Sequence, residues 1–108
     1  MQSGIDGGPQ LQLPERFALS QNYPNPFNPS TTIQIDIPTA GLVTMAVYNL
    51  LGQEILRLVD RELQPGKYQF IWNGLDEGGN SVPSGIYLYR VRINGNEFAK
   101  TRKMILLH

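Results

Sequence analysis

The sequence predicts an all-β protein, an antiparallel β-sandwich of about seven strands. Apolar and polar residues alternate over several stretches, helical periodicity is hard to find, and turn residues separate the stretches at intervals of roughly 10 to 15 residues. A chain of 108 residues can build one domain around one hydrophobic core. Cysteine is absent, so neither disulfides nor thiolate metal ligands contribute to it.

The start of the chain is predicted to lie outside the folded domain. Residues 1–12 are rich in glycine and poor in apolar anchors, which indicates a flexible linker or a remnant of expression, with the domain at residues 13–108. These residues lack the basic and apolar regions of a signal peptide, so the signal of an exported protein would lie upstream. Leu13, Phe17 and Leu19 are expected to dock a short edge segment onto the core.

A proline-rich segment, residues 21–30, precedes the first long strand. Pro24, Pro26 and Pro29 each fix their own φ and keep the preceding residue out of the helical region. We therefore expect extended and tight-turn conformations that act as a stiff clamp before Thr31.

Six stretches from Thr31 onward have the pattern of strands. They are residues 31–37, 42–48, 53–59, 67–72, 86–93 and 97–107. Residues 54–61 also have the mixed spacing of a short helix, but the strand is favoured. Asn94-Gly95 predicts a type I′ hairpin turn, because that turn needs positive φ at both central residues.

The aromatic residues of two strands have two interpretations. Tyr68, Phe70 and Trp72 alternate along one strand, which is more typical of a core than of a sugar-stacking platform. Tyr87 and Tyr89 are less clear, because both faces of their strand carry large residues, so one of the two is a candidate for exposure.

Composition and motifs argue against several functions. The formal charge is zero, which disfavours nucleic-acid binding, and no apolar run approaches the roughly 20 residues needed to cross a bilayer. The only histidine is the terminal His108, where a frayed end would prevent its use as a base. The carboxylates are scattered. We therefore expect no catalytic residues, no cofactor and no small-molecule substrate.

The loop at residues 73–81 invites a calcium hypothesis, because it offers several oxygen ligands. Its spacing does not match an EF-hand loop. A turn over residues 76–79 is favoured, with Asp76 at its first position and glycine where positive φ is needed. No helix follows Gly78 and Gly79, so a phosphate-binding loop is excluded, and no metal site is predicted.

Basic residues concentrate in the last predicted strand, at Lys100, Arg102 and Lys103. One interpretation is that they protect a terminal edge strand from pairing with other molecules. The other is that they belong to a tail that another protein recognises. The residues alone slightly favour the first.

Several separated motifs, in the same order along the chain, resemble the type A C-terminal sorting domains of bacterial type IX secretion, also called the Por secretion system family. The motifs are residues 19–33 (LSQNYPNPFNPSTTI), residues 47–52 (VYNLLG), Gly66, residues 72–74 (WNG) and residues 82–87 (VPSGIY). Residues 72–91 also resemble the immunoglobulin-like domain of flagellar hook-capping proteins. This second resemblance implies an immunoglobulin-like sandwich rather than a flagellar role.

The resemblance to sorting domains implies a non-catalytic tag for export to the cell surface. An upstream cargo domain in the same polypeptide would pass through an outer-membrane translocon, and a sorting peptidase would cut the chain before Phe17. The implied signal residues lie in the terminal hairpin, which would contact the translocon by charge and by strand addition. They are Gly95, Lys100, Arg102, Lys103, Ile105, Leu106 and Leu107. The family often ends in a basic residue, whereas this chain ends in His108.

Two other functions fit the same sequence. A carbohydrate-binding or adhesive accessory module of a surface enzyme predicts an exposed row of aromatic residues and retention on polysaccharide. A purely structural spacer predicts that changes in the tail affect neither export nor binding.

Overall fold

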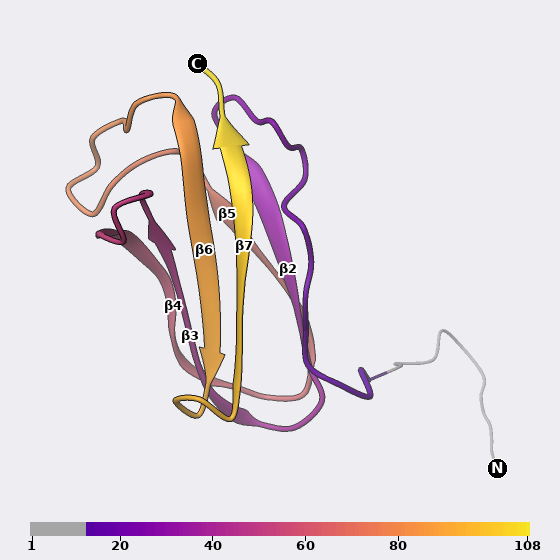
Figure 1. Ribbon diagram of the computed structural model, residues 1–108. Helices are drawn as coiled ribbons and strands as arrows, with labels where there is room; N and C mark the ends of the chain where they lie inside the picture. The colour runs from indigo at the N-terminus through magenta and orange to yellow at the C-terminus, as the bar shows by residue number, and fades with distance from the viewer. Residues whose placement is uncertain (1–12) are drawn as a thin grey trace, which may run out of the picture.

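The computed structural model describes residues 13–108, which form seven strands in two facing antiparallel sheets (Figure 1). The strands are β1 (Ala18–Leu19), β2 (Thr31–Ile37), β3 (Gly41–Tyr48), β4 (Glu54–Leu63), β5 (Gly66–Trp72), β6 (Gly85–Ile93) and β7 (Phe98–Leu106). The predicted antiparallel β-sandwich is confirmed, and so is a strand rather than a helix at β4. The linker predicted for residues 1–12 lies outside the described residues.

The smaller sheet has the strand order β1-β2-β5. Ile33, Ile35 and Ile37 of β2 are fully buried, while the side chains between them are partly exposed. This two-faced burial follows from the alternation of side chains along a strand. β1 is a two-residue edge strand whose Leu19 lies opposite Ile35, and Phe17 packs against the core, as expected for a short docked segment. The docking expected of Leu13 is wrong, because this side chain is 57% exposed and lies outside the core.

The larger sheet has the strand order β4-β3-β6-β7. Val43, Met45 and Val47 of the central strand β3 point into the sandwich and are fully buried. Two register shifts interrupt the pairing of β3 with β4, beside Ala46 and Tyr48. Irregularities of this kind bend and twist the strand that carries them, so β4 lies at the margin of a curved sheet.

The core is filled by the inner faces of both sheets, with an aromatic group at one end. Trp72 is almost fully buried, and its ring centroid lies 5.7 Å from that of Phe27 and 5.4 Å from that of Tyr87. Each such side chain contributes about 1.5–3 kcal/mol through burial alone. The predicted core position is confirmed for Trp72, whereas Tyr68 and Phe70 pack against the core but remain half-buried.

The suggestion that either Tyr87 or Tyr89 is exposed is wrong. Both are buried, because β6 is an interior strand of its sheet and both side chains lie on its inner face. The opposite face of β6 carries the more accessible Ile86 and Arg92.

A split of three and four antiparallel strands with buried inner faces is the architecture of an immunoglobulin-like sandwich. Over residues 13–108 the chain contains no helix of the length and apolarity needed to cross a membrane.

Candidate functional site

The loop between β6 and β7 differs from the predicted two-residue turn. Asn94 and Gly95 have positive φ values of 50° and 77°, as predicted, but the loop closes two residues later, where the N–H of Glu97 donates to the Ile93 carbonyl oxygen at 3.1 Å. Asn94 is held elsewhere: its N–H donates to the Leu42 carbonyl oxygen, and its Oδ1 accepts from the Leu42 N–H, each at 2.8 Å. These tertiary hydrogen bonds accompany the longer loop.

The proposed signal residues of the hairpin have very different surroundings. Leu106 is fully buried. Arg102 is half-buried, and its Nε donates to the Leu19 carbonyl oxygen at 2.7 Å, which ties β7 to β1. Lys100 and Lys103 are exposed, but they lie three residues apart on one strand and so point to opposite faces of the sheet. The basic residues therefore form no single patch.

The remaining three signal residues are accessible to different degrees. Ile105 and Leu107 are 37% and 51% exposed, and Gly95 lies in the loop at the other end of β7. The signal residues of the hairpin thus include one that is buried, one that is half-buried and hydrogen-bonded to β1, and others that are exposed. A partner protein could reach five of the seven signal residues without unfolding the domain: Gly95, Lys100, Lys103, Ile105 and Leu107.

The proline-rich segment covers the end of β7, a long-range contact that the sequence analysis missed. Phe27 forms a parallel bridge to Leu106: its N–H donates to the Ile105 carbonyl oxygen, and its carbonyl oxygen accepts from the Leu107 N–H, each at 3.0 Å. In Figure 1 this dark purple segment runs beside the yellow β7. The proline-rich segment, which was predicted to act as a stiff clamp before Thr31, therefore also connects the N-terminal part of the domain to its last strand.

Two side chains of the same segment extend this cover. The Oδ1 of Asn25 accepts from the Ile105 N–H at 2.9 Å, and the Nε2 of Gln21 donates to the Lys103 carbonyl oxygen at 2.7 Å. An edge strand with satisfied backbone groups cannot pair further at those positions. Among residues 13–108, no backbone hydrogen bond occupies the outer edge of β7 at residues 98–102, so this part of the edge could accept an added strand.

A buried polar network anchors the start of this segment. The hydroxyl of Tyr89 donates to the Ser20 carbonyl oxygen at 2.6 Å and accepts from the Asn22 N–H at 2.8 Å. The Nδ2 of Asn22, a buried residue, donates to Thr31 Oγ1 at 2.9 Å. Burial raises the pKa of Tyr89 to about 12, although the hydrogen bond from Asn22 opposes this rise. Asn22 and Tyr89 were not predicted as a pair, because 67 residues separate them.

The loop after β5 adopts the predicted turn. The Gly79 N–H donates to the Asp76 carbonyl oxygen at 3.0 Å, and Gly79 has a φ of 84°. The Oδ1 of Asp76 accepts from the N–H groups of Gly78 and Asn80 at 3.0 and 2.9 Å. This oxygen thus stabilises the loop itself. Within residues 13–108, no three histidine, aspartate or glutamate side chains come together as a metal ion would require.

The frayed end expected for His108 is wrong. One ring nitrogen, Nε2, lies 2.7 Å from the Val82 carbonyl oxygen, and the backbone N–H donates to Ser84 Oγ at 2.9 Å. These contacts fasten the residues after β7 to the loop before β6. The absence of catalytic function remains a prediction.

Residues 26–97, about two thirds of the chain, match the family model of the FlgD Ig-like domain. The chain therefore belongs to the FlgD Ig-like domain family. β7 and most of the proposed signal residues lie beyond the matched region. A comparison with curated proteins gave no match.

Solved structures of similar fold come from two groups of bacterial proteins. Dimeric latent PorU from Porphyromonas gingivalis matches with a TM-score of 0.66 at 19% identity, over 96% of this chain. PorZ from the same bacterium matches with a TM-score of 0.56 at 19% identity, over 85% of this chain. FlgD from Xanthomonas campestris matches with a TM-score of 0.56 at 20% identity, over 82% of this chain.

The aligned region is only a part of each of these larger proteins. It makes up 10% of the PorU chain, 11% of the PorZ chain and 65% of the FlgD chain. At these identities the likeness establishes the shared immunoglobulin-like fold.

Proposed function

We propose that this domain is a C-terminal sorting domain that directs a cargo protein through the type IX secretion machinery to the cell surface, without catalytic activity of its own. The observation that carries the proposal is the pairing of Phe27 with Leu106. The proline motif, one of the motifs that carry the resemblance to sorting domains, and the last strand, which holds most of the signal residues that the resemblance implies, are thereby parts of one structural unit. PorZ, which has a similar fold, is an essential bacterial surface component of the type-IX secretion system, and this agrees with a surface destination.

The accessible residues of β7 are the proposed contact with the secretion machinery. Lys100 presents positive charge on one face of β7 and Lys103 on the other. The open edge at residues 98–102 is the border between these two faces. A partner that adds a strand there would gain main-chain hydrogen bonds, while the two lysines would set its charge preference. Arg102 and Leu106 would act indirectly, by holding β7 in place.

Export of a reporter tests the proposal. A periplasmic signal peptide, a reporter protein and this chain would be joined and expressed in a bacterium with type IX secretion, and reporter at the surface would be measured. We expect surface delivery with the intact chain and none after deletion of residues 95–108. A strain without the secretion machinery is the control for other export routes. Undiminished delivery after the deletion would contradict the proposal.

A second pair of variants separates recognition from folding. Lys100→Glu with Lys103→Glu reverses both exposed charges, and we expect delivery to fall while thermal stability stays close to that of the parent. Arg61→Glu changes an exposed residue of β4 as a matched control and should leave delivery intact. If both sets of variants deliver equally, charge on β7 is not part of the signal.

A carbohydrate-binding or adhesive module is the second candidate, and one observation favours it. The rings of Tyr68 and Phe70 on β5 lie parallel, 10° apart with centroids at 6.4 Å, and remain half-buried. The other three rings considered for a platform, Trp72, Tyr87 and Tyr89, are buried and unavailable for stacking. A glycan array with the parent and a Phe70→Ala variant tests this candidate; no retention by the parent would exclude it.

A further inference from the structure

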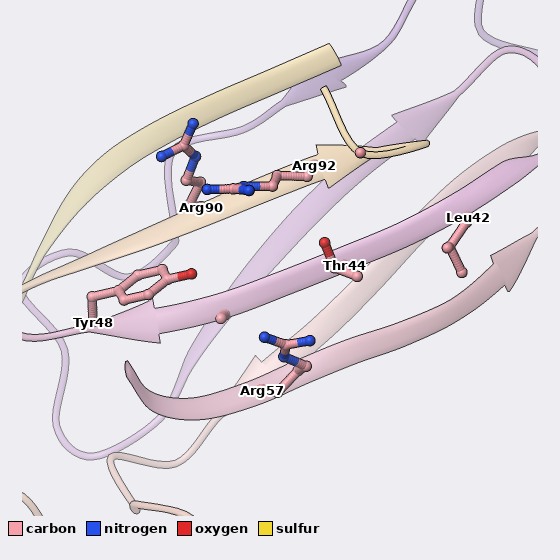
Figure 2. Close-up of a pocket in the computed structure, with 8 residues that line it drawn as sticks. Leu42, Thr44, Tyr48, Arg57, Arg90 and Arg92 are labelled. Atoms are coloured by element: carbon pink, nitrogen blue, oxygen red, sulfur yellow. The ribbon is translucent and has the colours of Figure 1, made fainter. Parts of the chain in front are cut away.

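A groove of about 380 Å³ lies on the outer face of the four-stranded sheet, away from the core. Alternate residues of β3, Thr44, Ala46 and Tyr48, line its centre. Figure 2 shows Arg57 on β4 at one side and Arg90 with Arg92 on β6 at the other. Three arginines therefore flank a strip of uncharged side chains.

The register of the sheet explains the hollow. Ala46 lies directly opposite Arg57 on one side and Arg90 on the other. The alanine side chain ends at Cβ and is buried, so it forms the floor of the groove between the two longer side chains. The hollow is thus a direct consequence of one small residue in a central strand.

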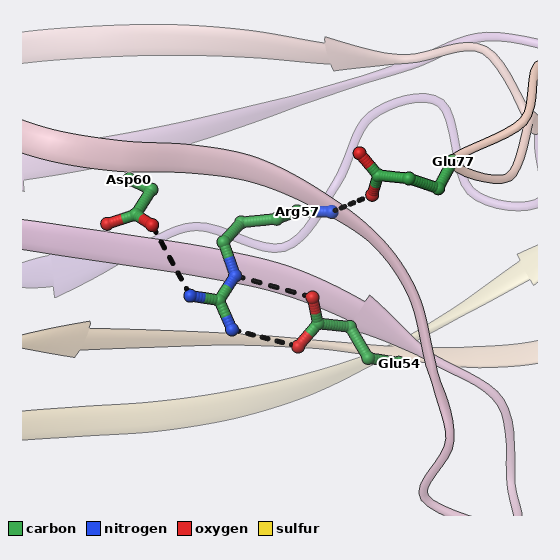
Figure 3. A network of polar contacts seen from close by, with 4 residues as sticks. All are labelled: Glu54, Arg57, Asp60 and Glu77. Atoms are coloured by element: carbon green, nitrogen blue, oxygen red, sulfur yellow. Dashed lines mark hydrogen bonds and ion pairs between the residues drawn. The ribbon is translucent and has the colours of Figure 1, made fainter.

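Arg57 is already neutralised by its own strand, as Figure 3 shows. Its Nη2 and Nε donate to the two carboxylate oxygens of Glu54 at 2.9 and 3.3 Å, and its Nη1 lies 3.4 Å from Asp60 Oδ2. The hydrogen bonds and charge of Glu54 raise the pKa of Arg57. The carboxylates of Glu54 and Asp60 are therefore engaged with the Arg57 guanidinium, and that of Glu77 accepts from the Arg57 backbone N–H at 3.4 Å.

Arg90 and Arg92 lack such partners. Neither forms an ion pair with any carboxylate of residues 13–108. The Nε of Arg90 is buried and has no hydrogen-bond acceptor among the described residues. The guanidinium groups of Arg90 and Arg92 therefore carry positive charge that no carboxylate of the described residues balances, so carboxylates from outside the domain would be attracted to this face.

The groove continues beyond these two arginines. Tyr48, Arg90 and Arg92 also line an adjoining hollow of about 410 Å³ that reaches Leu88 and Thr101 toward β7. A single small anion would occupy only part of this surface, whereas an extended chain segment would follow it. Arg90 and Arg92 are two residues apart on one strand, so their positions repeat at about 7 Å, which is also the repeat of alternate side chains in an extended peptide.

We propose that this face binds an extended acidic segment of a partner protein, with carboxylates at alternate positions on Arg90 and Arg92. Guanidinium groups bind carboxylates in a bidentate fork, so each arginine would hold one carboxylate, while the uncharged side chain between the two carboxylates would point away from the sheet. The adjoining hollow reaches Thr101 within the open part of β7, but Arg90 and Arg92 lie on β6, and the proposal does not depend on the sorting function.

Two synthetic peptides of the same composition test the proposal. Acetyl-Thr-Glu-Val-Glu-Thr-amide carries both carboxylates on one side when extended, whereas acetyl-Thr-Glu-Glu-Val-Thr-amide carries them on opposite sides. Each would be titrated into the ¹⁵N-labelled chain at low salt. We expect the first peptide to shift the Nε–H signals of Arg90 and Arg92 and to bind about threefold or more tighter than the second. Equal affinity for both peptides, or no shift with either, would overturn the proposal.

Variants and a competing anion complete the test. Arg90→Gln with Arg92→Gln should weaken binding of the first peptide about tenfold, while Arg61→Gln, which removes an exposed arginine outside the groove, should change it less than about twofold. Ala46→Leu, which fills the hollow without changing charge, should also weaken binding. Sodium phosphate at matched ionic strength should bind more weakly than the first peptide; equal or tighter binding would mean an anion site instead of a peptide site.

Discussion

At the scale of single residues, the hydroxyl of Tyr89 joins β6 to Ser20 and Asn22, which lie 69 and 67 residues earlier in the chain. Tyr89→Phe keeps the ring but leaves the Asn22 N–H and the Ser20 carbonyl oxygen without their partner. We expect a loss of about 1–3 kcal/mol in the free energy of unfolding. Urea denaturation measures it, with Tyr68→Phe as the control. The Tyr68 hydroxyl donates to the Gln64 carbonyl oxygen at an exposed position, so its loss should be smaller. Equal losses in the two variants would mean that the buried hydrogen bonds of Tyr89 stabilise the fold no more than the exposed hydrogen bond of Tyr68.

The same hydroxyl predicts a pH dependence of stability. Tyrosine has an ordinary pKa of 10.0, and burial raises that of Tyr89 to about 12. Between these values the unfolded chain releases the proton while the folded chain keeps it, so the free energy of unfolding falls as pH rises. Below this range the contribution is fully present. Urea denaturation between about pH 9 and about pH 12 should give a flatter profile for Tyr89→Phe than for the parent. Tyr23→Phe, which removes an exposed hydroxyl, should keep the parent's slope; a parental slope in Tyr89→Phe would refute the assignment.

At the scale of elements, β7 is an edge strand whose second half is already covered. The Ile105 N–H depends on a side chain, the Oδ1 of Asn25. Asn25→Ala should therefore speed amide hydrogen exchange at Ile105 while leaving Val91, in the centre of the sheet, as protected as before. Exchange followed by NMR gives both rates in one sample. Asn96→Ala, in the exposed β6–β7 loop, is the matched control. Unchanged exchange at Ile105 in Asn25→Ala would show that the hydrogen bond from the Ile105 N–H to Asn25 is not formed in solution.

The strands themselves were predictable, because their signal is local. The alternation of Ile33, Ile35 and Ile37 results from one face of β2 meeting the core, and any window of a few residues contains that pattern. The β6–β7 loop was predicted only in part. The positive φ of Asn94 and Gly95 follows from residue type, whereas the extra loop length accompanies a contact with Leu42 far away in the sequence.

At the scale of the whole molecule, the candidate site was predictable as a list of residues but not as a surface. Basic residues in the last strand are visible in the sequence, yet the half-buried position of Arg102 depends on β1, and the cover over Ile105 depends on the proline segment. The groove on the outer face depends on the register that brings Ala46 between two arginines. These arrangements arise from pairing between segments that are distant in the sequence, and such pairing produces no periodic pattern of residue types from which it could be predicted.

The domain boundary is the last testable consequence of this arrangement. The family match begins at residue 26, but the core also includes Leu19, which lies before the match. Leu19 and Phe27 are core side chains of the segment before β2, and each such apolar side chain contributes about 2–5 kcal/mol by mutational measure. Their sum approaches the whole stability of about 5–15 kcal/mol expected for a small domain. We therefore expect a chain that begins at Leu13 to unfold cooperatively at the temperature of the full chain, and a chain that begins at Thr31 to be unfolded.

Thermal unfolding followed by circular dichroism and a ¹H–¹⁵N spectrum would distinguish these chains. A chain that begins at residue 26 keeps Phe27 but loses β1 and Asn22, and it should have an intermediate stability with an unprotected edge at β2. Cooperative unfolding of the chain from Thr31 near the temperature of the full chain would contradict this. The proline segment would then be a covering added to a complete sandwich, whereas its buried Phe27 and its bonds to β7 make it a part of the fold.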